Sequence, residues 1–455
     1  MKDYDKSNFF LLCSANSILL FYTLTYVVAH ELLSLQMMWK THNAKPKFTM
    51  RYFSITIILF TIPVFGQQTL PIWLDSTEIK RELTWSGSGQ IHSSHLGSDV
   101  SRTILFGGFI SDEMKDNSFK LLRSNGMNRT GAILSSDLVY TDYTINLFKK
   151  KQYGLVVLAG YQNYFAVSYS SDLFKLLANG NAELDGSIDL TNTRFFQMGH
   201  QKLGFGVLDK KSRSTFSVSL VNSAGFQTID LVNGVFSQNA NKDTTDVLLI
   251  GSYAGNSLGG FSNGLGAALD IDMRIPVLIG KNKILIQLTA QNVGFVRYNR
   301  ASFQYDVDTN YRYTGFTLNQ IQNFSQNEAF SLADTLNLVR QSGGQTLWLP
   351  GFLQVAKIVD RNSTNLFQSF FGLNVFTQII YLPQAFAGVH WQPNRTFAAG
   401  FHGSYGGLGG ARLGLYADVL LGQFRIGFSS QDLLGTLTNS GYGQSLLFRL
   451  VWQQK

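Results

Sequence analysis

The chain has 455 residues and a formal net charge of +8, with 45% hydrophobic and only 15% charged residues. Charged content below the roughly 25% typical of soluble domains, with 43 glycines and 7 prolines, disfavours a disordered chain or a helical bundle and favours long strands joined by tight turns. The longest basic run covers only residues 149–151, so the positive charge does not indicate a nucleic-acid surface, and we expect no nucleic-acid partner.

Two apolar segments stand at the beginning of the chain. Residues 9–29 are mostly apolar and uncharged, and they are long enough to span a membrane as a helix. Residues 52–65 form a shorter apolar run, with basic residues before it and the small residue Gly66 after it. This second layout is that of a secretory signal peptide.

We therefore expect translation to start at Met50, with residues 1–49 an upstream extension and residues 50–66 a signal peptide. The exported chain would begin near Gln67. The only cysteine, Cys13, would then be absent from it, so no disulfide could stabilise the fold. A membrane anchor in the first apolar segment is the alternative.

Residues 67–102 show no regular alternation of apolar and polar side chains and contain several glycines. We expect them to form an N-terminal plug or a periplasmic segment, and residues 103–455 to form the body of the protein. His92 and His95 are three residues apart, but a metal site would need further ligands, and Asp99 is the only one nearby. We interpret the two histidines as polar plug residues and expect no metal or other cofactor.

From Gly131 onward, apolar and polar side chains alternate, and turn-forming residues recur at short intervals. Successive side chains of a strand point to opposite faces, so each segment predicts one lipid face and one lumen face. In residues 265–274 we expect Leu269 to face lipid and Asp270 the lumen, so that replacing Asp270 by Asn changes stability little. The side chains that we expect in the lumen are Asp270, Asp272, Arg274, His402, Asp418 and Arg425.

The end of the chain, residues 442–453, alternates in the same way. An apolar strand with a near-terminal tryptophan is typical of the strand that closes an outer-membrane barrel by pairing with the first strand. A C-terminal edge strand of a soluble sandwich is the alternative. The residues that we assign to the apolar face of the closing strand are Leu446, Phe448, Leu450 and Trp452.

The candidate strands number about 14, within a range of 12–16. We therefore predict an all-β fold, a transmembrane antiparallel β-barrel with short loop helices. Residues 171–177, followed by Gly180, and residues 327–339 carry apolar residues at helical spacing and predict two such helices.

No residue pattern indicates catalysis. A catalytic triad cannot be recognised from spacing alone. The glycine-rich residues 403–410 join two predicted strands rather than a strand and a helix, so they form a hairpin tip and not a phosphate-binding loop. We expect the protein not to be an enzyme.

Several short motifs are spread along the chain: residues 171–181 (SDLFKLLANGN), 188–190 (IDL), 202–206 (KLGFG), 292–295 (NVGF), 311–316 (YRYTGF) and 429–435 (SSQDLLG). They resemble a family of outer-membrane barrels from Bacteroidota that is defined as a domain of unknown function. The resemblance implies a barrel distantly similar to fatty-acid transporters and to barrels associated with type IX secretion. It implies neither an agreed substrate nor catalytic residues.

The sequence thus predicts a β-barrel in the outer membrane of a Gram-negative bacterium. Its expected partners are outer-membrane lipid and the barrel-assembly machinery. One hypothesis is a passive channel or transporter for a small apolar molecule. The other is a structural or docking barrel for a secretion-system or surface protein. A continuous polar ladder along the lumen favours the first, and large apolar loop surfaces favour the second.

Overall fold

The computed structural model describes residues 79–180, 186–239, 241, 244–256, 261–279, 282–313, 340–360, 362–438 and 441–455. The expected signal peptide and the expected helix at residues 327–339 lie outside these residues. Among these described residues, 79–101 and those from 110 onward belong to one compact unit.

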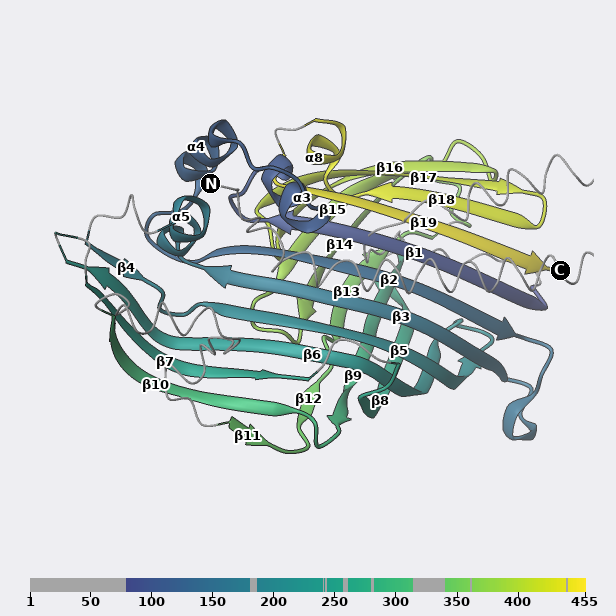
Figure 1. Cartoon of the computed structure of the whole chain (residues 1–455). Coiled ribbons are helices and arrows are strands. Elements are labelled where there is room, and N and C mark those ends of the chain that lie inside the picture. The colour runs from purple at the N-terminus through teal and green to yellow at the C-terminus, as the bar shows by residue number, and fades with distance from the viewer. Residues whose placement is uncertain are drawn as a thin grey trace, which may run out of the picture. The chain divides into compact units, whose positions relative to one another are not determined.

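The strands of the barrel wall are β1 (Arg81–Ser93), β2 (Asn128–Asp142), β3 (Tyr153–Tyr169), β5 (Arg194–Asp209), β6 (Thr215–Gln238), β8 (Gly264–Ile279), β9 (Asn282–Tyr298), β13 (Phe352–Ile358), β14 (Phe367–Phe376), β15 (Gln384–Trp391), β16 (Phe397–Gly406), β17 (Ala411–Leu421), β18 (Phe424–Ser430) and β19 (Gly443–Gln454). Each pairs antiparallel with the next in this order, and β19 pairs with β1. The fold is therefore a closed antiparallel barrel of 14 strands, which confirms the predicted fold class (Figure 1).

Closure leaves no unpaired edge in the wall, which is what a sheet needs in order to stand in lipid. The last strand makes the closing contact along almost its whole length: twelve residue pairs join β1 and β19, from Arg81 with Gln454 to His92 with Gly443. On its other side β19 pairs with β18.

The prediction of a plug is wrong for residues 81–93, because they form the first strand of the wall. Its inward positions are polar, and Glu82, Thr84, Ser86 and Ser88 line the lumen. Its outward positions include Leu83, Trp85 and Ile91, but glycines occupy two outward positions in between. Because glycine has no side chain, these two positions gave no apolar signal in the sequence. The ring of Trp85 packs beside that of Phe448 on β19, with centroids 5.3 Å apart.

The outer face of the wall is apolar and the inner face is mostly polar or densely packed. Leu220, Phe205 and Leu265 are 77%, 61% and 68% exposed. In contrast, Ser219 and Ala268, which stand next in sequence to outward residues, are buried. This distribution fits an outer face that contacts lipid hydrocarbon.

The two ends of the barrel differ. At one end the strands are joined by short turns, for example residues 422–423 between β17 and β18, where Gly422 takes a φ of 63°. At the other end several connections are long, as at residues 94–127 between β1 and β2 and residues 299–351 between β9 and β13, although only residues 407–410 join β16 and β17. Below, these are the short-turn end and the long-loop end.

In the described part of the chain, the helices at the long-loop end are α3 (Ser98–Phe106), α4 (Asp112–Leu121), α5 (Ser171–Asn179) and α8 (Leu433–Leu437). The short η1 (Leu147–Lys149) lies in a turn at the other end. α5 and its Gly180 cap confirm the predicted helix at this position. No helix in the described part of the chain combines the length and the apolarity that a bilayer crossing requires.

A second sheet branches from β6, which is 24 residues long. Residues 215–223 of β6 pair with β8 in the wall, whereas residues 227–238 pair with β7 (Thr245–Gly255). β10 (Phe303–Tyr313) pairs with β7, and β4 (Ser187–Asp189) and β11 (Arg340–Ser342) add short edges. We call this the extension sheet; β4, β7 and β10 gather on the left of Figure 1. The short β12 (Thr346–Trp348) pairs with β9.

Candidate lumen site

A cavity of about 330 Å³ occupies the lumen, with walls from both sides of the barrel. Four of the predicted lumen residues line it. Its lining includes Glu82, Ser88, Asp137, Lys202, Asp270, Asp272, Arg274, Phe352, Phe376, Tyr381, Gln384, Arg425, Gln431, Leu447, Arg449 and Gln453.

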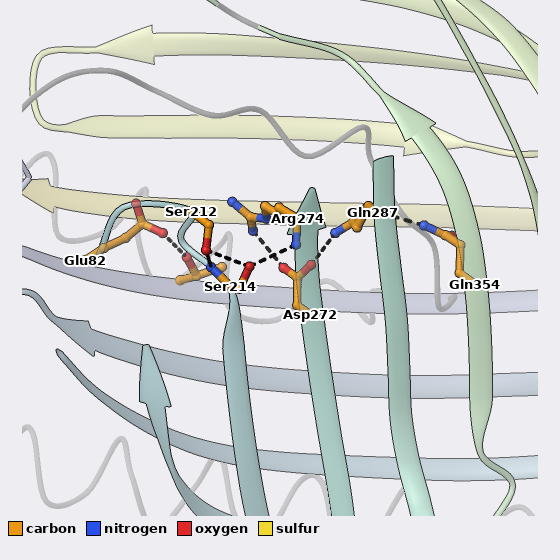
Figure 2. A network of polar contacts seen from close by, with 8 residues as sticks. Glu82, Ser212, Ser214, Asp272, Arg274, Gln287 and Gln354 are labelled. Carbon is orange, nitrogen blue, oxygen red and sulfur yellow. Dashed lines mark hydrogen bonds and ion pairs between the residues drawn. The ribbon is translucent and has the colours of Figure 1, made fainter. Parts of the chain in front are cut away.

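A polar network stands at the short-turn side of this cavity (Figure 2). The Arg274 guanidinium donates to Asp272 at 2.7 Å, and the other carboxylate oxygen of Asp272 accepts from the Gln287 amide at 2.7 Å. Gln287 in turn contacts Gln354 at 3.5 Å. The network links β8, β9 and β13, so Asp272 and Arg274 neutralise each other and brace neighbouring strands.

Asp270 is held by a distortion of the sheet. The pairing of β8 with β9 shifts between Leu269 and Ile271, and Asn292 opposite them adopts a φ of 53°. This bulge turns the backbone N–H of Asn292 toward Asp270. The Asp270 carboxylate accepts a hydrogen bond from this N–H at 2.9 Å and another from the Lys202 ammonium at 2.8 Å. Both side chains of the ion pair are largely buried. Asp270 is thus part of a built ion pair and not a free lumen charge.

Asp418 lies between two arginines. Its carboxylate is fully buried, 3.8 Å from Nε of Arg425 and 3.9 Å from an Nη of Arg449. Arg425 and Arg449 line the cavity, and Asp418 stands behind them. Arg274, Arg425 and Arg449 therefore each have a carboxylate nearby.

The remaining predicted lumen residue, His402, is buried on β16 but does not line the cavity. Its ring lies 6.3 Å from that of Phe370. His92, expected in a plug, is also buried on β1 and faces the interior. Neither histidine belongs to a cluster of three or more potential metal ligands among the residues that the structure describes.

The long-loop half of the lumen is filled by apolar side chains. Along β3 the buried positions run from Val156 and Leu158, which line the cavity, through Gln162 to Tyr164 and Ala166 in the apolar cluster. The cluster comprises Ile133, Tyr164, Phe196, Met198, Phe226, Tyr298, Leu349, Phe352, Phe376, Ile380, Tyr381, Leu408 and several alanines and valines. Phe352, Phe376 and Tyr381 belong to both the cluster and the cavity wall, so the apolar cluster caps the cavity.

One lumen feature had no distinct signal in the sequence. Arg412, on β17 directly after the glycine-rich hairpin tip, is only 5% exposed. Its Nη2 donates to the Gly406 carbonyl at 2.9 Å, whereas Nε and Nη1 have no hydrogen-bond partner. Its inward parity on β17, two residues before Gly414 and six before Asp418, is the signal that could have identified it.

The comparisons with known proteins give distant structural likenesses. The toluene transporter TodX of Pseudomonas putida is 8% identical, with 86% of this chain and 98% of TodX covered and a TM-score of 0.33. The translocator domain of the autotransporter NalP from Neisseria meningitidis is 6% identical, with 84% and 91% covered and a TM-score of 0.30. A mutant of the porin from Rh. blastica is 9% identical, with 82% and 100% covered and a TM-score of 0.24. No family model and no curated protein matches the chain.

Proposed function

We propose that the protein is a passive channel for a small apolar molecule in the outer membrane of a Gram-negative bacterium. The observation that carries the proposal is the capped lumen: a cavity of about 330 Å³ meets a cluster of aromatic and aliphatic side chains. An apolar solute gains by transfer from water onto such a surface, whereas an ion does not.

The proposal includes insertion by the barrel-assembly machinery, direct contact with outer-membrane lipid and no catalytic step. The apolar outer face supports the lipid contact. The short motifs described above support an origin in the Bacteroidota.

The entry of N-phenylnaphthylamine into intact Gram-negative cells tests the channel. This apolar dye fluoresces once it has passed the outer leaflet, so cells that express the barrel should take it up several-fold faster than cells with an empty vector. The control is Phe371→Ala, because Phe371 is 54% exposed on the outer face of β14 and should leave uptake unchanged. Equal uptake with and without the barrel would refute the channel.

The extension sheet favours the alternative function, a docking barrel for a secretion-system or surface protein. β7 pairs with β6 on one side and with β10 on the other, outside the closed ring, and a channel does not need these two strands. In this case cross-linking in cells should attach a partner to β10, and dye entry should not depend on the barrel. Cross-linking that recovers only lipid would exclude docking.

A further inference from the structure

A row of buried polar side chains crosses the lumen wall at the long-loop end. In strand order from β15 to β1 the row comprises Gln384, Ser404, Arg412, Gln431 and Gln90, with His92 and His402 beside it. Ser404 is the cross-strand partner of Arg412, and Ser445, which bonds the Gln431 backbone amide at 2.6 Å, is the partner of Gln90. The row is therefore continuous over neighbouring strands.

Each member of the row has a buried polar atom without a hydrogen-bond partner. The donors are Nε and Nη1 of Arg412, Nε2 of Gln384 and Oγ of Ser404. Such atoms are rare in folded proteins, and leaving one unsatisfied costs free energy. Other such atoms are spread over the lumen, but nine of them gather in this row and its two histidines. This local grouping indicates a site that is completed by another molecule.

The charge of Arg412 identifies the kind of molecule. A guanidinium remains protonated in proteins, so its burial requires an anion nearby. Arg274, Arg425 and Arg449 each have one, in Asp272 or Asp418. Among the described residues, no carboxylate forms such an ion pair with Arg412. Asp432 interacts with Arg412 only electrostatically at longer range. Its Oδ1 accepts a hydrogen bond from the backbone N–H of Gly435 in α8.

The site is connected to the cavity. Gln384 and Gln431 line the cavity, as does Tyr381, whose hydroxyl lies against Arg412 and 3.3 Å from Gln384 Oε1. The Tyr381 ring packs on Phe376 with centroids 4.0 Å apart, so apolar surface begins directly beside the guanidinium.

We propose that Arg412 binds the carboxylate of a small organic acid whose apolar body lies against Tyr381 and Phe376. A single uncompensated positive charge matches a single carboxylate, and the neighbouring aromatic rings match a ring or short chain. The inference deepens the proposed function, on which it rests, by adding an anionic group to the apolar solute.

Titration calorimetry of the full-length barrel in detergent tests the site, with benzoate and its uncharged analogue benzamide as probes. Benzoate should bind at least about 10-fold more tightly than benzamide, the effect of one charge-assisted hydrogen-bonded contact. Arg412→Gln should remove this preference, and Arg412→Lys should keep part of it. Arg312→Gln, which removes an arginine paired with Asp246 on the extension sheet, should leave benzoate affinity unchanged.

Equal affinities of the wild-type protein for benzoate and benzamide would overturn the proposal, and this comparison needs no variant to fold. An unchanged benzoate preference in a folded Arg412→Gln variant would also overturn it. Failure of the arginine site can be distinguished from failure of the proposed channel. Benzoate binding without dye entry would sink the channel alone, and dye entry without a benzoate preference would sink the arginine site alone.

Discussion

At the scale of single residues, the lumen is governed by compensated charges. Asp270 is buried against Lys202, Asp272 against Arg274, and Asp418 against two arginines. Removing one partner of a buried pair leaves the other charge desolvated, which costs more than the pair contributes. Some of these pairs join strands that are not neighbours in the wall. Lys202 on β5 and Asp270 on β8 are one example.

Asp270→Asn should destabilise the protein by about 3 kcal/mol, since it leaves the Lys202 ammonium with a weaker partner. This replaces the expectation from the sequence that the change would be nearly silent. Denaturant titration of barrels refolded into lipid vesicles measures the difference. The control is Asp246→Asn on the extension sheet, where the solvent-exposed pair with Arg312 should contribute little to stability. Equal effects at both positions would contradict the buried-pair argument.

On the outer face, the stability cost of an introduced arginine should depend on its depth in the bilayer. Leu269→Arg, in the middle of β8, should cost about 2–4 kcal/mol because the charge would stand in hydrocarbon. Val277→Arg, on the same face but close to the short-turn end of the strand, should cost at most about 1 kcal/mol. The same refolding titration compares them, and a larger cost at Val277 would show that the membrane band is misplaced along the strand.

At the scale of elements, the closing strand and the branching strand determine the architecture. β19 joins the two ends of the wall, so it has partners on both sides. β6 belongs to the wall over its first half and to the extension sheet over its second. The branch lets the chain add a sheet at the long-loop end without opening the ring.

Removal of residues 450–455 should abolish stable insertion, because β1 and β18 would lose their partners over the short-turn half of the seam. The folded barrel should migrate as a compact species on gels unless heated. The truncated chain should migrate as unfolded and be degraded by protease. Removal of Lys455 alone, which lies outside β19, should change neither property. A compact, protease-resistant truncated species would disprove the role of the seam.

At the scale of the whole molecule, an apolar cluster lies across the long-loop half of the lumen in the described part of the chain. The cavity extends from this cluster toward the short-turn end. Passage along the lumen therefore requires side chains of this cluster to move. Phe376 is the central one, because its ring contacts both Phe352 and Tyr381, with centroid distances of 5.2 and 4.0 Å.

The wild-type protein should consequently conduct ions poorly in planar bilayers, and Phe376→Ala should raise the single-channel conductance several-fold. The same substitution should cost about 3–5 kcal/mol, because it leaves a cavity in a packed cluster. Phe371→Ala, on the outer face of the same strand, should not change the conductance. High conductance of the wild type would show that the cluster does not close the lumen.

The sequence by itself determined the fold class and much of the inward and outward assignment. Regular alternation, as in residues 265–274, depends only on the two-residue period of a strand and on which side meets lipid. A different local signal, helical spacing with a cap and a glycine stop, predicted α5. The strand rule failed at β1, because glycines at outward positions carry no hydrophobic signal even though the strand pairs with β19 along its length. The predicted start at Met50 lies outside the described residues and stays a prediction.

Only the tertiary structure decided which inward residues meet. The pairing of Lys202 with Asp270, the bulge at Asn292 and the buried Arg412 depend on contacts between side chains far apart in sequence. The strand period gives the side on which a residue lies, but not its height in the barrel or its neighbours across the lumen. Those follow from register and closure, which are set jointly by all 14 strands.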